Sequence, residues 1–218
     1  MTWEQAGLWT GVLVSGLYHG LSPAMGWPLA VSNGLMARRD DAVFAALGYL
    51  GLGHAGAVMA LTLPFGLLAS LAAWQREIRF VAAALVIGYG IALLARRRHA
   101  RALARIPPSR LALWSFAIAL AHGAGLMLVP LYLGLCGTAA GTGHQAAASL
   151  AVGNAGMAVL VALVHTAAMI AGGGAMAWVV YRHVGLALVS RSWLNTEAAW
   201  ALSLVLVGGM SLMAATAR

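Results

Sequence analysis

Long apolar runs with few charges constrain the fold of this chain more than any other feature. Several of them reach the roughly 20 residues that a helix needs to cross the hydrocarbon core of a bilayer. With 62% hydrophobic residues, 8% charged residues and a mean hydropathy of +0.87, the 218-residue chain has too little polar surface to cover a soluble globule. The sequence therefore predicts an all-α integral membrane protein whose surface contacts a lipid bilayer.

Polar and helix-breaking residues divide the chain into six predicted transmembrane helices within one domain, residues 1–218. The predicted helices cover about 3–36, 42–73, 80–95, 111–134, 146–178 and 197–215. We expect breaks or bends in the first helix at Pro23, Gly26 and Pro28 and in the fourth at Pro130. At Gly173 in the fifth helix we expect either close approach of another backbone or unwinding of the helix. A short loop with Arg76, Glu77 and Arg79 is expected before the third helix.

The arginines predict how the chain lies in the membrane. All thirteen basic residues are arginines, and ten of them lie in the connections after the first, third and fifth predicted helices. Because cytoplasmic loops are enriched in basic residues, we expect the basic loop 96–110 to be cytoplasmic and both termini to lie outside a bacterial inner membrane. This charge is interpreted as a topology signal, and no nucleic-acid partner is expected.

The two halves of the chain repeat one pattern. Each has a His-Gly pair followed by a methionine and a proline, beginning at His19 in the first half and at His122 in the second. Each also has a histidine on the next predicted helix, His54 and His165. Because three helices per half is an odd number, the sequence predicts two inverted repeats, about 1–95 and about 111–218, with helices one and four crossing near the centre.

Histidines and methionines inside the apolar segments form the candidate binding site. Ionisable residues at membrane depth usually line a cavity or a pathway, and a neutral imidazole binds copper, nickel, zinc or iron. Thioethers favour Cu(I). Each residue alone also fits a structural role, a hydrogen bond to a neighbouring helix or core packing. The candidate metal ligands are His19, His54, His122 and His165, and the candidate contacts to the substrate add Met25, Met59, Met127 and Met169.

The segment His19-Gly20-Leu21-Ser22-Pro23-Ala24-Met25, followed by Gly51-Leu52-Gly53-His54, resembles the nickel/cobalt transporter family and the related hydrogenase and urease accessory permeases. The resemblance covers the first two helices. It implies a small polytopic permease in which His19 and His54 are ligands and Pro23 breaks the helix. Ser22 stands where that family usually has an acidic residue and Met25 where it has a second histidine, which favours a softer and neutral ligand set.

The sequence thus favours a transporter of a transition-metal ion such as copper, nickel or cobalt over an enzyme. A serine-hydrolase triad is not expected, because no carboxylate lies near the histidines; Ser15, Ser22 and Ser115 are interpreted as structural. Two alternatives stay open. One histidine pair of either half could hold a haem in a b-type or quinone-linked electron-transfer protein. The chain could also be a non-catalytic subunit of a larger membrane complex, or form a homo-oligomer.

Overall fold

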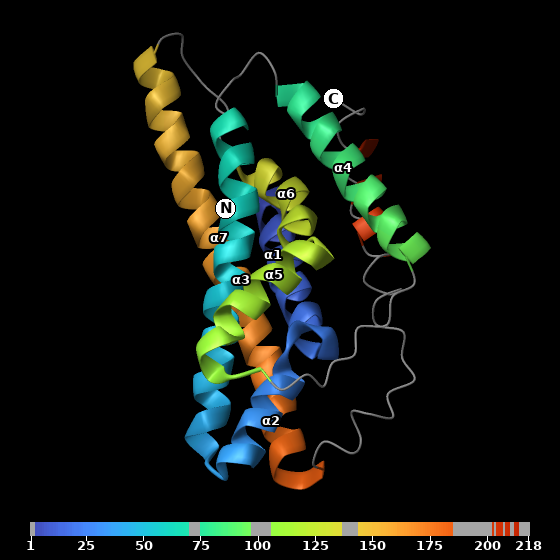
Figure 1. The fold of residues 1–218 in the computed structure, drawn as a ribbon. Coiled ribbons are helices and arrows are strands. Elements are labelled where there is room, and N and C mark those ends of the chain that lie inside the picture. Colours follow the sequence, from blue (N-terminus) through green and yellow to red (C-terminus); the bar gives the residue numbers. More distant parts are fainter. Residues whose placement is uncertain are drawn as a thin grey trace.

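The computed structural model describes residues 3–69, 75–96, 106–136 and 144–184, together with isolated positions between 202 and 213. This part of the chain is helical and contains no strand (Figure 1). The elements are α1 (Trp3–Leu21), the 3-10 turn η1 (Pro23–Met25), α2 (Trp27–Ala37), α3 (Asp40–Ala69), α4 (Gln75–Arg96), the 3-10 turn η3 (Pro108–Arg110), α5 (Leu111–His122), α6 (Ala124–Leu135), α7 (His144–Val179) and the π-helical turn η4 (Val180–Val184). The all-helical prediction is confirmed for these residues.

Two of the described helices are long and apolar enough to cross a membrane. They are the segments Asp40–Phe65 of α3 and Val152–His183 of α7 with η4, with mean hydropathies of 1.5 and 1.9. The pair formed by η3 with α5 and by α6, bent by 66°, would make a third span. Six spans and two inverted repeats stay predictions, and most of the basic loop 96–110 and of the sixth helix at 197–215 lies outside the described residues.

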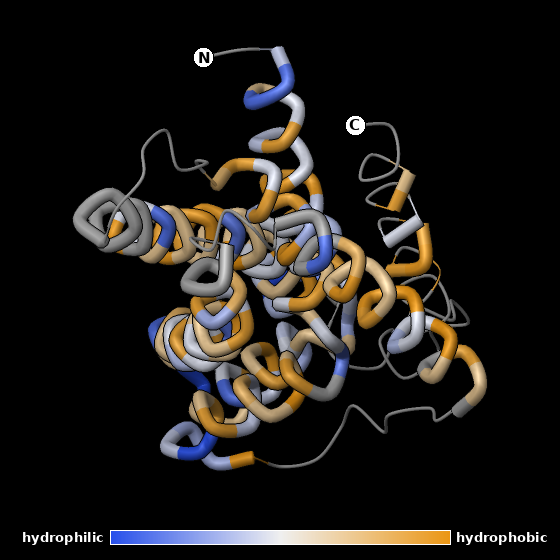
Figure 2. Tube along the Cα trace, turned by 90° about the horizontal axis from the view of Figure 1, so that it is seen from above, coloured by the Kyte–Doolittle hydropathy of each residue, from blue (hydrophilic) through white to orange (hydrophobic). Residues whose placement is uncertain are grey.

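Hydrophobic residues occur all around the helices, as the hydropathy colours along the backbone show (Figure 2). Some of their side chains are buried in the core and others are exposed. Leu52 on α3, Leu113 on α5 and Val152 on α7 are 70%, 70% and 75% exposed. Polar residues are found in the interior instead, among them three histidines. This distribution fits a lipid-facing surface, because exposed apolar side chains cost little in hydrocarbon whereas polar groups need partners inside the protein.

The chain breaks between α1 and α2 at a glycine and two prolines. Gly26 has a φ of 104°, a left-handed conformation that glycine adopts without strain. Pro23 opens η1 and Pro28 lies in the first turn of α2, where a missing N–H loses no helical hydrogen bond. The indole Nε1 of Trp27 donates to the carbonyl oxygen of Leu21 at 3.3 Å, which compensates one carbonyl at the end of α1.

The predicted break at Pro130 is wrong, because α6 runs through that residue and the chain bends at Gly123 instead. Gly123 has a φ of 71°, and its N–H bonds to the carbonyl of Leu120, which ends α5 in the manner typical of glycine. A proline is tolerated inside a membrane helix where neighbouring groups satisfy the freed carbonyl.

Of the two roles predicted for Gly173, unwinding of the helix is wrong, because α7 is continuous through this residue, and close approach of another backbone is what the structure shows. A Cβ atom at Gly173 would lie 3.0 Å from the carbonyl oxygen of Gly20. The glycine therefore permits close contact between α7 and α1, and the helix does not unwind there.

The predicted loop before the third helix is the first turn of α4 in the structure. Arg76, Glu77 and Arg79 all lie within Gln75–Arg96. A carboxylate in the first turn of a helix interacts favourably with the helix dipole, so Glu77 stabilises this start and does not interrupt it.

Two helix interfaces position the interior polar residues. Helix α1 packs along α7, and α3 packs against α5, α6 and α7, whereas α4 lies at the side of the bundle and contacts α6 (Figure 1). Gly16 and Gly20, four residues apart on α1, face α7 so closely that a Cβ atom would collide with the carbonyl oxygens of His165 and Met169. Small residues at this spacing let two helix backbones approach each other in a membrane.

Candidate functional site

Three of the four predicted histidines meet in the interior of the bundle. His19 lies near the end of α1, His54 near the middle of α3 and His165 in α7, and their exposed fractions are 0%, 1% and 0%. The ring centres are 5.1 Å apart for His19 and His54, 5.4 Å for His19 and His165, and 5.4 Å for His54 and His165. We call these three residues the histidine cluster.

The cluster contains buried nitrogen atoms that lack a hydrogen bond. The Nε2 atoms of His54 and His165 have no hydrogen-bond partner among the described residues, and neither has the hydroxyl of Thr166, which follows His165 in the chain. A buried polar atom without a partner costs roughly 1–3 kcal/mol, and native proteins keep few of them. Two buried imidazole nitrogens without a hydrogen-bond partner at one place make the cluster the candidate binding site.

Glycines beside the histidines bring the helices together. Gly20 follows His19 in the contact between α1 and α7 described above. Gly53 precedes His54, and a Cβ atom there would collide with the carbonyl oxygen of Ala112 on α5. Sequence reasoning missed the role of Gly16 and Gly20, although the Gly-x-x-x-Gly spacing was a signal that could have revealed it.

Ser15 contacts the cluster directly. Ser15 is 3% exposed, and its hydroxyl donates to the carbonyl oxygen of Val12 at 2.8 Å and lies 3.1 Å from Nδ1 of His165. The interpretation of Ser15 as only structural is therefore incomplete. The available signal was its position four residues before His19, because residues at this spacing share one face of a helix.

The fourth histidine, His122, ends α5 next to the bend at Gly123. Its side chain is half-buried, and its Nδ1 atom lies 3.0 Å from the carbonyl oxygen of Ile118, one turn earlier. A ligand role for His122 stays a prediction.

The four methionines lie in different surroundings. Met25 in η1 and Met169, one turn after His165 on α7, are 7% and 3% exposed. Met59 packs against an apolar cluster centred on Val12, Leu128 and Tyr132, and Met127 packs with Val86 and Leu204. Met59 and Met127 thus contribute to core packing, and a ligand role for any of the four methionines stays a prediction.

The present orientation of the side chains does not form a metal-binding group. Among the described residues, no set of three or more histidine, cysteine or carboxylate side chains is arranged to hold a metal ion. The rings of His54 and His165 are nearly parallel, at 18°, and the ring of His19 stands at 67° and 81° to them. The ring separations, however, match the ~5 Å expected for imidazoles that share one tetrahedral ion with bonds of about 2.0–2.1 Å. Shared binding would therefore require the rings to rotate, with no large movement of the helices.

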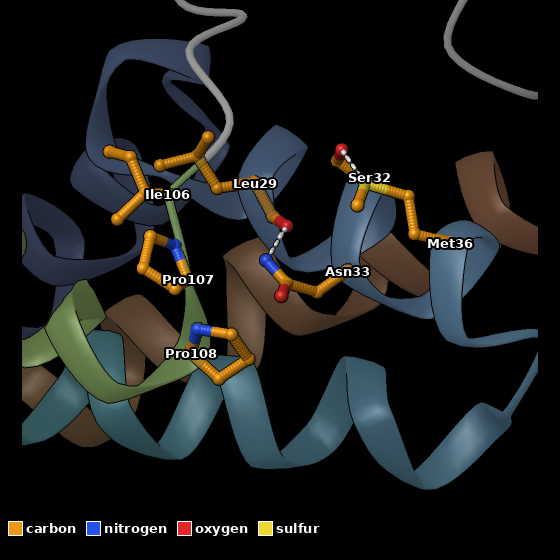
Figure 3. Close-up of a pocket in the computed structure, with 7 residues that line it drawn as sticks. All are labelled: Leu29, Ser32, Asn33, Met36, Ile106, Pro107 and Pro108. Atoms are coloured by element: carbon orange, nitrogen blue, oxygen red, sulfur yellow. Dashed lines mark hydrogen bonds between the residues drawn. The ribbon is translucent and has the colours of Figure 1, made fainter.

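A pocket of about 320 Å³ lies elsewhere, between α2 and the segment before α5 (Figure 3). It is lined by Leu29, Ser32, Asn33, Met36, Ile106, Pro107 and Pro108. The amide of Asn33 donates to the carbonyl oxygen of Leu29 at 2.8 Å, so its polar lining is partly satisfied within α2. None of the eight candidate residues lines this pocket, and it offers no imidazole to a metal ion.

Charged and aromatic side chains gather where α7 ends and α3 begins. Arg182 lies 5.1 Å from the centre of the Trp178 ring and 3.9 Å from the carboxylate of Asp40. Arg39 forms an ion pair with Asp41 at the same turn. Aromatic and basic residues at the ends of apolar helices are typical of the boundary between a membrane and water.

No family model, curated protein or solved structure matches this chain. The resemblance to the nickel/cobalt transporter family therefore rests on the residues of the first two predicted helices.

Proposed function

We propose that the protein is a membrane permease that moves a transition-metal ion, such as copper, nickel or cobalt, through the histidine cluster. One observation carries the proposal: three fully buried imidazoles from three separate helices lie with their ring centres 5.1–5.4 Å apart. A structural histidine needs only one partner on a neighbouring helix, whereas three in mutual contact are costly unless they share a ligand.

The chemistry of the donor atoms supports a borderline or soft ion. Neutral imidazole nitrogen suits copper, nickel and zinc, whereas magnesium and calcium prefer several oxygen ligands. The carboxylates of the described helices all lie in first turns, at Glu4, Asp40, Asp41 and Glu77. The cluster is therefore a neutral site, and an ion that enters it keeps its charge, which suits passage through the protein better than permanent retention.

The ring contacts favour an ion over a haem held by His19 and His54. Axial ligation places two imidazoles on opposite faces of a flat macrocycle. The rings of His19 and His54 instead contact each other edge to face, with their centres 5.1 Å apart. A visible spectrum of the purified protein separates the two functions, because a Soret band would contradict the permease proposal.

The proposal includes six spans in two inverted three-helix repeats, in a bacterial inner membrane with loop 96–110 cytoplasmic and both termini outside. Two broken helices support it. The chain bends shortly after His19, at Gly26, and directly after His122, at Gly123. Discontinuous helices in equivalent positions of two halves are typical of transporters that bind their substrate near the bilayer midplane.

Metal retention and uptake test the function. Protein purified without chelators and reconstituted in vesicles should take up Cu(I), Ni²⁺ or Co²⁺, and His54→Ala or His165→Ala should weaken binding by ~100-fold because each removes a ligand. His183→Ala is the matched control, since this exposed histidine lies in η4 at the end of α7. Unchanged binding and uptake in both cluster variants would contradict the proposal.

A further inference from the structure

The hydroxyl of Ser15 contacts two groups but has only one hydrogen to donate. One contact is the carbonyl oxygen of Val12 at 2.8 Å, and the other is Nδ1 of His165 at 3.1 Å. A carbonyl oxygen can only accept a hydrogen bond, whereas an imidazole nitrogen can donate or accept according to its tautomer. Both contacts are hydrogen bonds only if the Ser15 hydrogen points to Val12 and His165 donates from Nδ1.

This assignment decides which nitrogen of His165 has a free electron pair. A neutral imidazole carries one N–H group, so an N–H at Nδ1 leaves the lone pair on Nε2. The Nε2 atom of His165 is the one that is buried and has no hydrogen-bond donor among the described residues. The lone pair on Nε2 is therefore available to a ligand.

We propose that Ser15 is a positioning residue that holds His165 in the Nδ1–H tautomer and so makes Nε2 the metal-binding atom. This inference rests on the proposed function and names the atom through which the site takes a cation with affinity for neutral nitrogen. A hydrogen bond to the second ring nitrogen orients a ligating histidine and increases its basicity. Ser15 supplies this bond from a different helix, α1, to a histidine on α7.

The close contact of the two helices maintains this hydrogen bond. Gly16, next to Ser15, faces the backbone carbonyl of His165, where a Cβ atom would collide with the oxygen. Any separation of α1 from α7 would lengthen the bond from Ser15 to Nδ1 and release the ring. The tautomer of His165 thus reports whether the two helices are packed together.

The tautomer can be measured without a metal. Protein labelled with [15N]histidine, stripped with chelator and held above pH 7, should give a protonated Nδ1 and an unprotonated Nε2 for His165, assigned by the loss of these signals in His165→Gln. A protonated Nε2 would overturn the inference. Since no metal is involved, the result does not depend on whether the protein transports an ion.

Variants at position 15 test the link to binding. Ser15→Ala removes the acceptor, so the Nε2–H form should appear and the affinity for Ni²⁺ or Cu(I) should fall by about 10–100-fold. Ser15→Thr keeps the hydroxyl and should retain the wild-type tautomer, and Ser32→Ala, on α2, is the control. An unchanged tautomer in Ser15→Ala would overturn the inference. A wild-type Nδ1–H tautomer in a protein that binds neither ion would instead overturn the proposed function alone.

Discussion

At the scale of single residues, the histidine cluster combines burial with unsatisfied hydrogen-bonding capacity. His54 and His165 place Nε2 atoms in the interior without a hydrogen-bond partner among the described residues, and the hydroxyl of Thr166 adds a third such atom. Apolar residues at these positions would avoid the cost of burying polar groups, so the cluster reduces the stability of the protein, and the proposed function accounts for this cost.

Binding should depend on pH with a defined sign. A metal ion and a proton compete for the same imidazole lone pair, so the affinity should fall as the pH decreases. Equilibrium dialysis with Ni²⁺ between about pH 8 and pH 5 measures this, with circular dichroism to show that the helices stay folded. An affinity that stays constant down to the pH at which the helices unfold would argue against histidine ligands.

At the scale of helices, glycine contacts decide how closely the elements that carry the histidines approach. The backbone of α1 meets that of α7 at Gly16 and Gly20, and α3 meets α5 at Gly53. In a membrane, where burial of apolar surface does not drive helices together, such close packing and polar contacts supply the association energy.

A methyl group at Gly20 should therefore destabilise the packing of α1 against α7. Gly20→Ala places a Cβ atom against the carbonyl oxygen of Met169, and the overpacking should destabilise the fold by roughly 1–3 kcal/mol and separate α1 from α7. Gly48→Ala is the control, because a Cβ atom there would meet nothing within 4 Å. Thermal unfolding in detergent measures both variants, and equal midpoints would contradict the packing argument.

At the scale of the whole molecule, the described residues show the distribution of polar groups that the predicted membrane protein requires. Exposed apolar side chains cover the described helices, and interior polar residues include Ser15, His19, His54 and Asn154. The ion pairs among the described residues are found at one end of the bundle. Arg39 pairs with Asp41 where α2 meets α3, and Arg182, at the end of α7, pairs with Asp40.

The orientation of the molecule is testable by labelling. In a chain with Cys136→Ala, a single cysteine at position 100 should react only with reagents that reach the cytoplasm, and one at position 218 only with reagents applied outside. The reason is the excess of arginines in loop 96–110. Labelling of both positions from the same side would contradict the six-span topology.

The sequence by itself determined the class of the protein and the first break in its helices. Apolar composition and the rarity of charges indicate membrane helices, because the hydrocarbon core of a bilayer disfavours charged side chains and backbone groups without hydrogen bonds. The residues Pro23, Gly26 and Pro28 indicate a break because their effect on the backbone is local. The same local reasoning failed at Pro130 and left two roles open at Gly173, where packing against neighbouring helices decides the outcome.

Only the tertiary structure decided which side chains meet. His54 and His165 are far apart in the chain, and no periodicity of a single helix indicates that their rings lie 5.4 Å apart. The hydrogen bond between Ser15 and His165 spans 150 residues in the sequence. Such contacts depend on how closely two backbones approach, and that distance is set by glycines on one helix together with the carbonyl groups of another, a relation between segments that neither segment contains alone.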